Sequence, residues 1–384
     1  MFETFFDLFP VPKFIDPPFA GLSISDKSIL FVSFSKHGSD NLILKSFDRV
    51  DLPDGVVQNG DIINPEKLVE ILSEFRKKND LNFVKASLPE EKAFLFRASI
   101  PRMSHQEAKE ALQFKIEENV PISANEAIFD FYTMSDGSAE DKVVVSALPQ
   151  KVAYDYLEVL NKSGFQTIVF EVESQAIAKS VIKEGDQSPF LIVNIEKEHV
   201  GLFAVEKGLV QFTSTVDLEK DFFKSRNEGF ESNLEENKNE QQGASEATDN
   251  SGVITIRGDQ RGDRRLLKDE IEKLISYWSS FGISNNSSFK IEKIIACGDV
   301  VLEPGFKKYF AENFDLPMEP ADVWVNAFSL EDYVPDLDYK ESLKYAVSVG
   351  LALPFLKKKK QQKVAPVKKN KKVVSQDINK NKNV

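Results

Sequence analysis

The chain has 384 residues, of which 41% are hydrophobic and 29% charged, which is ordinary for a soluble globular protein of two or three domains. Its net charge of −12 is unevenly distributed, because the segment 357–384 holds eleven Lys and one Asp and leaves the rest of the chain near −22. An acidic body of this kind argues against nucleic acid as a partner. The basic segment could contact acidic phospholipid or an acidic protein, and a solvated, disordered tail is the alternative.

Cysteine usage and hydropathy indicate a cytoplasmic protein. Cys297 is the single cysteine, so no intramolecular disulfide can form and a reducing compartment is expected. No apolar run approaches the roughly 20 residues that a membrane-spanning helix needs. The N-terminus also lacks a basic segment followed by an apolar one, so a signal peptide is not expected.

The histidines and the standard catalytic motifs exclude several function classes. His37, His105 and His199 are far apart, and none has a second His or Cys at ligand spacing, so we expect no zinc site. The sequence contains no G-x-S-x-G, no P-loop and no G-x-G-x-x-G motif. These motifs therefore give no support for a hydrolase, a kinase or a dehydrogenase.

The first part of the chain has the pattern of an α/β lobe. Residues 1–18 form a Phe- and Pro-rich arm, which either packs on the body or anchors at a membrane surface. The apolar runs then predict a hairpin, a strand, a helix that begins at Asn64-Pro65, and a further strand. The strands are expected over 19–34, 42–53 and 82–89.

A smaller unit follows. A strand over 93–101 leads to a helix with a capping box of Ser104 and Glu107, which ends near Asn119. Two strands, a helix with Gly164 as its C-terminal cap and another strand complete a β-α-β-β-α-β pattern. The pattern suggests a small domain inserted over 90–171.

The rest of the chain predicts a second α/β lobe. A helix over 174–182 precedes a second hairpin within 191–205. The segment 225–265 is rich in Asn, Glu, Gln, Gly and Ser, and we expect it to be disordered. A long helix, a strand over 293–300, a further helix and a final helix over 342–353 complete the lobe.

Four stretches carry a family resemblance. They are LPDGVVQNGDIIN (52–64), IPRMSHQEAKEALQFKIEENVP (100–121), FEVESQAIAKSV (170–181) and YAVSVGLAL (345–353). In this order they resemble the type IV pilus assembly protein PilM family, a branch of the actin-like ATPases that is related to the division protein FtsA. FtsA itself is a poorer match, because the C-terminal tail is rich in lysine and is not an amphipathic helix.

The resemblance implies a two-lobed actin-like (RNase H-like) α/β fold with an SHS2-type domain inserted in the first lobe. The expected divisions are the arm 1–18, a first lobe of 19–89 and 172–188, the inserted domain 90–171, a second lobe 189–356 with the insertion 225–265, and a basic tail 357–384. In actin-like ATPases a nucleotide lies between the lobes, where backbone N–H groups of two hairpin turns hold its phosphates. A carboxylate near each turn positions Mg²⁺ and water, and a Gly-Gly turn admits the adenosine.

The first turn departs from the pattern that the resemblance implies. The family reads G-L-D-I-G-S-S-S, and this chain reads GLSISDKS. Ser23 stands at the position of the metal-side Asp and Ser25 at that of a Gly. Asp26 is displaced by two to three residues, whereas Lys27 could still meet a phosphate and Ser28 keeps its place.

The other two turns depart as well. Asn194 replaces the Asp of V-D-I-G and cannot offset the charge of Mg²⁺, and Glu196 replaces its Gly and adds an anion beside the expected phosphates. The third turn, Cys297-Gly298-Asp299, is one Gly short. The sequence therefore predicts a degenerate nucleotide site without catalytic or metal-ligating residues, which takes ATP or ADP with Mg²⁺ only if binding is retained. Its residues are Ser23, Ser25, Asp26, Lys27, Ser28, Asn194, Glu196, Gly298 and Asp299.

The resemblance also implies a function. The chain is expected to be a scaffold at the inner face of the cytoplasmic membrane, where it binds the cytoplasmic N-terminal segment of a PilN-like membrane protein in a groove beside the inserted domain. Two alternatives remain open, namely an active actin-like ATPase of pilus assembly and an FtsA-like filament protein. An oligomer is compatible with each of these readings.

Overall fold

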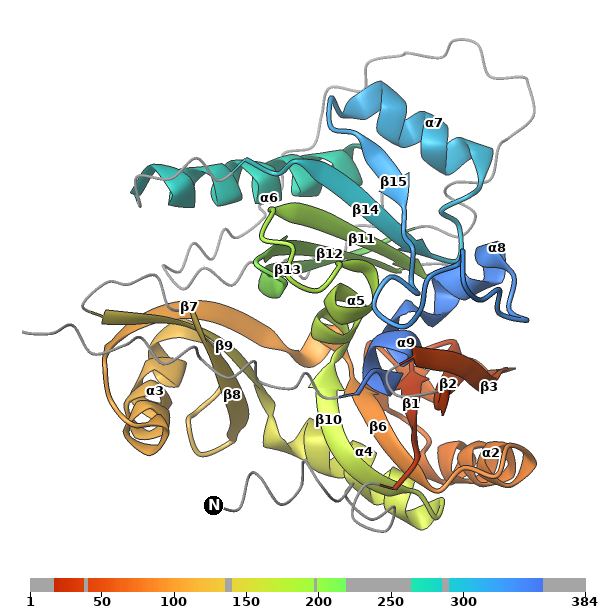
Figure 1. Ribbon diagram of the computed structural model, residues 1–384. Helices are drawn as coiled ribbons and strands as arrows, with labels where there is room; N and C mark the ends of the chain where they lie inside the picture. The colour runs from red at the N-terminus through yellow and green to blue at the C-terminus, as the bar shows by residue number, and fades with distance from the viewer. Residues whose placement is uncertain are drawn as a thin grey trace, which may run out of the picture. The chain divides into compact units, whose positions relative to one another are not determined.

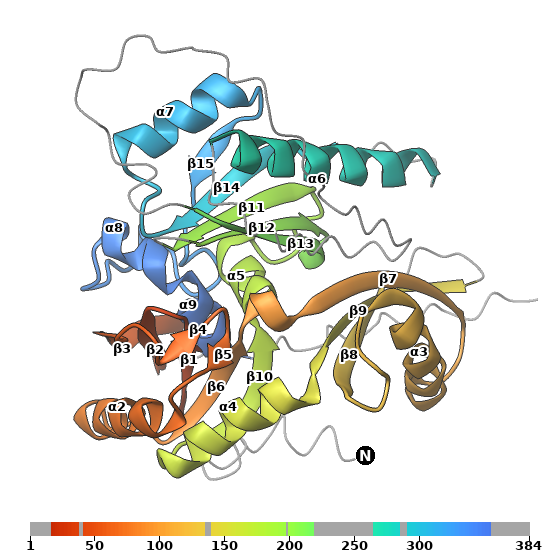
Figure 2. The same cartoon turned by 180° about the vertical axis from the view of Figure 1, so that it is seen from behind.

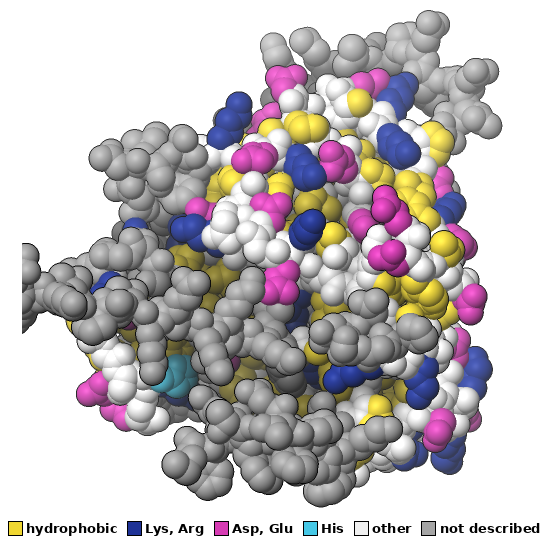
Figure 3. Space-filling model, in the orientation of Figure 1, with side chains coloured by type: hydrophobic (Ala, Val, Ile, Leu, Met, Phe, Trp, Pro, Cys, Tyr) yellow, Lys and Arg dark blue, Asp and Glu magenta, His cyan; other side chains and the backbone are white. Residues whose placement is uncertain are grey.

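The computed structural model describes residues 17–37, 41–134, 140–196, 199–218, 264–284 and 290–354. Most of the predicted arm 1–18, nearly all of the predicted insertion 225–265 and the basic tail 357–384 lie outside the described residues. None of the helices in the described ranges is long and apolar enough to cross a membrane. On the part of the surface that Figure 3 describes, acidic and basic side chains are interspersed.

The first lobe is built on a five-stranded sheet in the order β10-β6-β1-β2-β3. Strands β1 and β2 form the predicted antiparallel hairpin, and β1 and β10 both pair in parallel with β6. The helices α2 and α4 pack on one face of this sheet (Figure 1), where Phe75 and Tyr156 share a core with Leu22. The bounds are β1 Phe19–Ile24, β2 Ser28–His37, β3 Asn41–Asp51, β6 Phe83–Leu88, β10 Gln166–Val172, α2 Pro65–Lys78 and α4 Gln150–Lys162.

The second lobe repeats this arrangement on a five-stranded sheet in the order β13-β12-β11-β14-β15. The second predicted hairpin is β11 and β12, which pair antiparallel, and β11 pairs in parallel with β14. The helices α6 and α7 lie above this sheet in Figure 1, and Leu267, Ile271 and Trp278 of α6 are buried. The bounds are β11 Phe190–Glu196, β12 His199–Glu206, β13 Leu209–Asp217, α6 Arg264–Ser284, β14 Lys293–Gly298, α7 Pro304–Asn313 and β15 Met318–Pro320.

Two short helices, α5 (Glu173–Val181) and α9 (Ala346–Ala352), join the lobes. They contact each other, α9 packs on β1, β2 and β6, and α5 packs on β12 and β13. A Cβ added at Gly350 would lie 1.8 Å from the carbonyl oxygen of Ala176, and one at Gly21 would lie 2.1 Å from that of Ser348. Glycine is required at both positions because the backbones approach closely. The predicted final helix is divided into α8 (Tyr339–Ser342), a 3₁₀ turn over Leu343–Tyr345 and α9.

The small domain is a three-stranded antiparallel sheet in the order β7-β9-β8, covered by α3 (Figure 2). Its core contains Phe96, Leu112 and Val145. The predicted capping box is confirmed, since Ser104 accepts from the N–H of Glu107 and the Glu107 carboxylate accepts from that of Ser104. The bounds are β7 Phe94–Pro101, α3 His105–Asn119, β8 Ala127–Met134 and β9 Glu140–Pro149.

The expected limit of the small domain at residue 171 is wrong. Helix α4 buries Tyr156 and Leu160 in the core of the first lobe, and β10 pairs with β6 of the first sheet. The chain therefore returns to the first lobe at α4. The sequence pattern predicts the helix and the strand of this segment. It does not show which sheet β10 joins, because β10 pairs with residues about 80 positions away along the chain.

Candidate functional site

The two hairpin turns meet at a small hollow between the lobes. The side chains that line it from the first lobe include Ser25 and Asp26, and those from the second include Asn194, Glu196 and His199. Its volume, counted as space for the centres of water molecules, is about 30 Å³, which holds roughly two waters. The complete lining is Ile24, Ser25, Asp26, Gly60, Pro89, Glu90, Glu91, Tyr156, Glu173, Asn194, Glu196, His199, Val200, Gly201, Phe203 and Thr215.

The hollow is strongly acidic. Five carboxyl groups line it, and no Lys or Arg is found among its lining residues in the described part of the chain. Burial raises the pKa of Glu90, Glu91 and Glu173, and neighbouring carboxylates add to the effect on the latter two. Burial, followed by the charges of Asp299 and Glu91, raises the pKa of Glu196 to about 7. An environment that already disfavours carboxylate charge also disfavours phosphate charge.

The turn of the first hairpin is closed by its own backbone. The N–H of Ser25 donates to the carbonyl of Ser28 at 2.9 Å, and the Ser25 hydroxyl donates to the same oxygen at 3.3 Å. Lys27 turns toward Asp54, with its Nζ 2.8 Å from the carboxylate, and does not line the hollow. The expected contact between Lys27 and a phosphate therefore has no counterpart in this arrangement.

Ser23 also lies outside the hollow. Its side chain is buried, and its Oγ lies 2.9 Å from the Oγ of Ser348 on α9. The Ser348 hydroxyl is also within 3.2 Å of the carbonyl of Leu30. Ser23 and Ser348 thus contribute a polar contact between the first sheet and α9, and Ser28 is buried within its own turn.

The second turn brings Asn194 and Glu196 to the hollow, as expected from the sequence. The Asn194 Oδ1 lies 3.3 Å from the Sγ of Cys297 on the neighbouring strand β14. Burial, and then the charge of Glu196, raises the pKa of the Cys297 thiol, so the thiol is protonated and can donate to Asn194. The amide is therefore oriented by a contact inside its own sheet.

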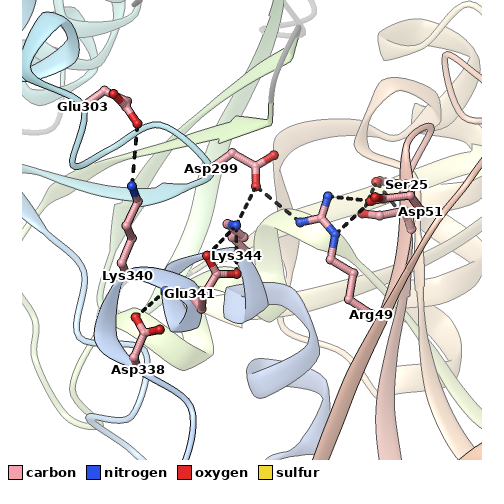
Figure 4. A network of polar contacts seen from close by, with 10 residues as sticks. Ser25, Arg49, Asp51, Asp299, Glu303, Asp338, Lys340, Glu341 and Lys344 are labelled. Atoms are coloured by element: carbon pink, nitrogen blue, oxygen red, sulfur yellow. Dashed lines mark hydrogen bonds and ion pairs between the residues drawn. The ribbon is translucent and has the colours of Figure 1, made fainter.

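The third turn connects the two lobes through ion pairs. Gly298 has a φ of +104°, and an added Cβ would lie 2.1 Å from the carbonyl oxygen of Ile195, so glycine is required there. The next residue, Asp299, points its carboxylate at Arg49 of β3, at 3.4 Å, and at Lys344, at 4.0 Å (Figure 4). Arg49 in turn binds Asp51 at 2.9 Å.

A second bridge runs through His199, which the sequence analysis had only excluded as a zinc ligand. Its Nδ1 lies 2.5 Å from Asp217 on β13, and its Nε2 lies 3.6 Å from Asp26 in the first turn. Asp26 also accepts from the N–H groups of Asn59 and Gly60, at 2.6 and 3.0 Å. Burial opposes the charge on Asp26, but the ion pair with His199 and the hydrogen bonds from Gly60 and Asn59 keep its pKa below the usual range.

The structure thus brings four of the nine predicted residues together at the hollow: Ser25, Asp26, Asn194 and Glu196. Sequence reasoning missed Arg49, Glu90, Glu91, Glu173 and His199. Their positions depend on contacts between distant segments, and only the pairing of His199 with Glu196 across the second hairpin was a local signal. Within the described ranges, no group of three His, Cys, Asp or Glu side chains could hold a metal ion.

The sequence profile of a family described as type IV pilus assembly protein PilM matches residues 21–222, and no curated protein matches significantly. A solved structure titled PilM-PilN type IV pilus biogenesis complex aligns with a TM-score of 0.62 and 18% identity, over 87% of this chain and 97% of that one. This likeness shows the two-lobed actin-like fold.

Two other structures are more remote. The cytoplasmic domain of EpsL, an inner membrane component of the type II secretion system of Vibrio cholerae, aligns with a TM-score of 0.36 and 15% identity, over 52% of this chain and 71% of that one. The ethanolamine utilization protein EutJ from Carboxydothermus hydrogenoformans aligns with a TM-score of 0.42 and 12% identity, over 89% of this chain and 90% of that one.

Proposed function

The chain belongs to the type IV pilus assembly protein PilM family, and from this premise we propose that it is a scaffold of the pilus assembly platform with a nucleotide site that no longer supports catalysis. It would bind the cytoplasmic N-terminal segment of a PilN-like membrane protein. The similar solved structure is a complex of PilM with PilN, which supports this choice of partner. Binding would hold the protein at the inner face of the cytoplasmic membrane.

The observation that carries the scaffold proposal is the acidity of the hollow. Five carboxyl groups line the space where an actin-like ATPase would hold phosphates and Mg²⁺. Arg49 and Lys344, which lie beside the third turn, are engaged with Asp299. The residues present therefore do not fit Mg-ATP, and the turns are better explained as contacts that fix the lobes.

We place the partner segment beside the small domain, on one of two sheet edges. Strand β8 ends the small sheet and β10 ends the first sheet, so each has an edge without a neighbouring strand among the described strands. Ile128 and Tyr132 of β8 and Ile168 of β10 are exposed by 39% to 44%. Tyr132 of β8 lies close enough to Glu171 of β10 that the Glu171 carboxylate adds to burial in raising the pKa of Tyr132 to about 12. The two edges therefore lie near each other. An extended peptide can add to such an edge through its backbone and fill apolar contacts with alternate side chains.

Isothermal titration calorimetry with a synthetic peptide of the PilN-like N-terminal segment from the same genome tests the partner. We expect binding at tens of micromolar or tighter, weakened about tenfold or more in Ile168→Ser and Tyr132→Ser, because buried apolar contacts are lost. The matched control is Ile63→Ser, which removes an isoleucine exposed by 56% near α2 and should leave the affinity unchanged. Absence of any binding to the wild type would overturn the partner.

A thermal shift and hydrolysis assay with millimolar Mg-ATP tests the other half of the proposal. We expect no measurable turnover and no stabilisation, because a ligand that does not bind the native state leaves its melting temperature unchanged. Clear stabilisation together with Mg-dependent turnover would instead favour the active ATPase. Sedimentation of the protein under the same conditions would reveal an FtsA-like filament.

The basic segment 357–384 supports a further contact of the scaffold, with acidic phospholipid. Its eleven Lys give a charge density that attracts an anionic membrane surface. We expect the full chain to float with vesicles that contain phosphatidylglycerol, and a chain ending at Pro354 to remain in solution. Equal flotation of the two chains would show that the segment 357–384 does not bind the membrane.

A further inference from the structure

One side chain connects the turn of the first lobe to the sheet of the second. His199 begins β12 and lies 2.5 Å from Asp217 on β13 and 3.6 Å from Asp26 in the β1–β2 turn. Asp26 is fixed from its own side by the backbone N–H groups of Asn59 and Gly60. The imidazole can serve both carboxylates at once only when it is protonated, because a neutral ring has a single N–H donor.

The surroundings of His199 are acidic from every element packed against it. Asp26 faces it from the β1–β2 turn, Glu91 from the connection after β6, Glu196 from β11 and Asp217 from β13. Glu173 of α5 lies next to Glu196 and Glu91. The other charged groups nearby are Glu90, beside Glu91 and Glu173, and Asp299, beside Glu196. A positive charge on His199 therefore offsets part of the negative charge around it.

We propose that His199 is a proton-dependent latch, which holds the two lobes closed through Asp26 and Asp217 and releases them when it loses its proton. The latch goes beyond the scaffold role, because it concerns the relative position of the lobes and requires no partner. It occupies the place between the lobes where a nucleotide would lie in an actin-like ATPase. Closure then depends on pH and on these three side chains.

The direction of the pH dependence follows from the geometry. Burial opposes the charge on His199, but the hydrogen bond to Asp217 and the ion pair with Asp26 outweigh burial and raise its pKa to about 10. In the opened state the ring would return toward an ordinary value of about 6.5. The latch therefore holds fully below about pH 6.5, and opening becomes up to about tenfold easier for each pH unit between 6.5 and 10.

Other groups set the limits of this window. Glu196, with a pKa of about 7 in the closed state, acts in the same direction, because its deprotonation adds a negative charge to the hollow as the pH rises. Asp26 has a lowered pKa and acts in the opposite direction. Its contribution is present above its ordinary value of about 4 and is lost as the pH falls through the lower, closed-state value. Because Glu196 favours opening as the pH rises above its ordinary value of about 4.3, we expect the closed lobes to be most populated near about pH 4 to 5, between the windows of Asp26 and Glu196.

Distance measurement between the lobes tests the proposal. Spin labels on Glu74→Cys of α2 and Lys307→Cys of α7, both exposed, report the separation by double electron–electron resonance. Cys297 is buried and should not react. In the wild-type background we expect a single population at about pH 6 and a growing second population toward about pH 9. A distribution that does not change between these pH values would overturn the latch.

Two variants attribute the change to His199. In His199→Gln the second population should already be present at about pH 6, and the pH dependence that remains should be the smaller one that Glu196 causes between about pH 4.3 and its pKa of about 7. In Asp217→Asn, which keeps the ring and removes its nearer carboxylate, the transition should move toward acid by at least one pH unit. His105→Gln, on the small domain, is the control and should behave as the wild type. A His199→Gln protein that keeps the wild-type pH dependence would contradict the proposal.

The test is independent of the proposed function. No nucleotide or peptide is present, so loss of the latch says nothing about the PilN-like partner, and failure of peptide binding leaves the distance measurement interpretable. Circular dichroism of each labelled variant establishes that its fold is retained before the distances are compared.

Discussion

Two of the places where the lobes meet differ in their chemistry. At the seam between α5 and α9, the contact is made by glycine and alanine backbones at very short distances, as at Gly350 and Ala176. At the rim of the hollow, the lobes meet through charged side chains, in the pairs of Asp26 with His199 and Arg49 with Asp299. The seam depends mainly on shape, whereas the rim depends on charge and protonation.

The difference explains which glycines the chain keeps. Gly21, Gly298 and Gly350 remain because another backbone lies where their Cβ would be. The turns carry Ser25 and Glu196 at positions that are glycine in the family pattern, and these side chains find space in the hollow. Glycine at these three positions is thus required by the fold itself.

Substitution at the seam should have the largest effect. Gly350→Ala drives a methyl group into the carbonyl of Ala176, so we expect a loss of at least about 3 kcal/mol of unfolding free energy. Urea denaturation measures it. The control is Gly55→Ala, where no atom lies within 4 Å and only the positive φ is strained, with a cost of about 1 kcal/mol. Equal losses in the two variants would show that the seam is not tightly packed.

Substitution at the rim should have a smaller effect that responds to salt. Arg49→Met leaves Asp299 with Lys344 alone, and because both partners of the pair are about one-fifth exposed we expect a loss of about 1–2 kcal/mol. Arg102→Met removes an ion pair of an arginine that is 55% exposed and should cost less than about 0.5 kcal/mol. If Arg49→Met is as mild as Arg102→Met in low salt, the Asp299 bridge does not hold the lobes.

Substitution of Ser23 should have the smallest effect on the free energy of unfolding. It also distinguishes most clearly between a role of Ser23 in the contact with α9 and a role in the nucleotide site. Ser23→Ala removes its contact with Ser348, and we expect a loss of about 1 kcal/mol in urea denaturation. The response of the protein to Mg-ATP should stay unchanged, because the side chain does not line the hollow. A change in that response upon Ser23→Ala would show that Ser23 contributes to nucleotide binding.

Local signals in the sequence predicted much of the fold. The Asn64 cap of α2, the capping box of Ser104 and Glu107, and both hairpins are confirmed. These features depend on residues within a few positions of each other. The limit of the small domain could not be predicted in this way, because β10 is assigned to the first lobe by its pairing with β6.

The sequence indicates which turns form the candidate site better than it indicates which side chains contact one another there. Asn194 and Glu196 both line the hollow, and their positions follow from the register of one hairpin. The motifs could not reveal that Asp26 meets His199, because 173 positions of chain separate the two and a one-residue change in either turn would separate their side chains. The orientation of Ser23 toward α9 likewise depends on a helix at the other end of the described chain.

The central claim is that this member of the family binds a partner segment without the use of a nucleotide. The most direct measurement is a calorimetric titration of the PilN-like N-terminal peptide into the full chain, with and without millimolar Mg-ATP. The account predicts the same affinity in both titrations and no heat from Mg-ATP alone. An affinity that Mg-ATP changes by tenfold or more, or peptide binding that requires Mg-ATP, would contradict it.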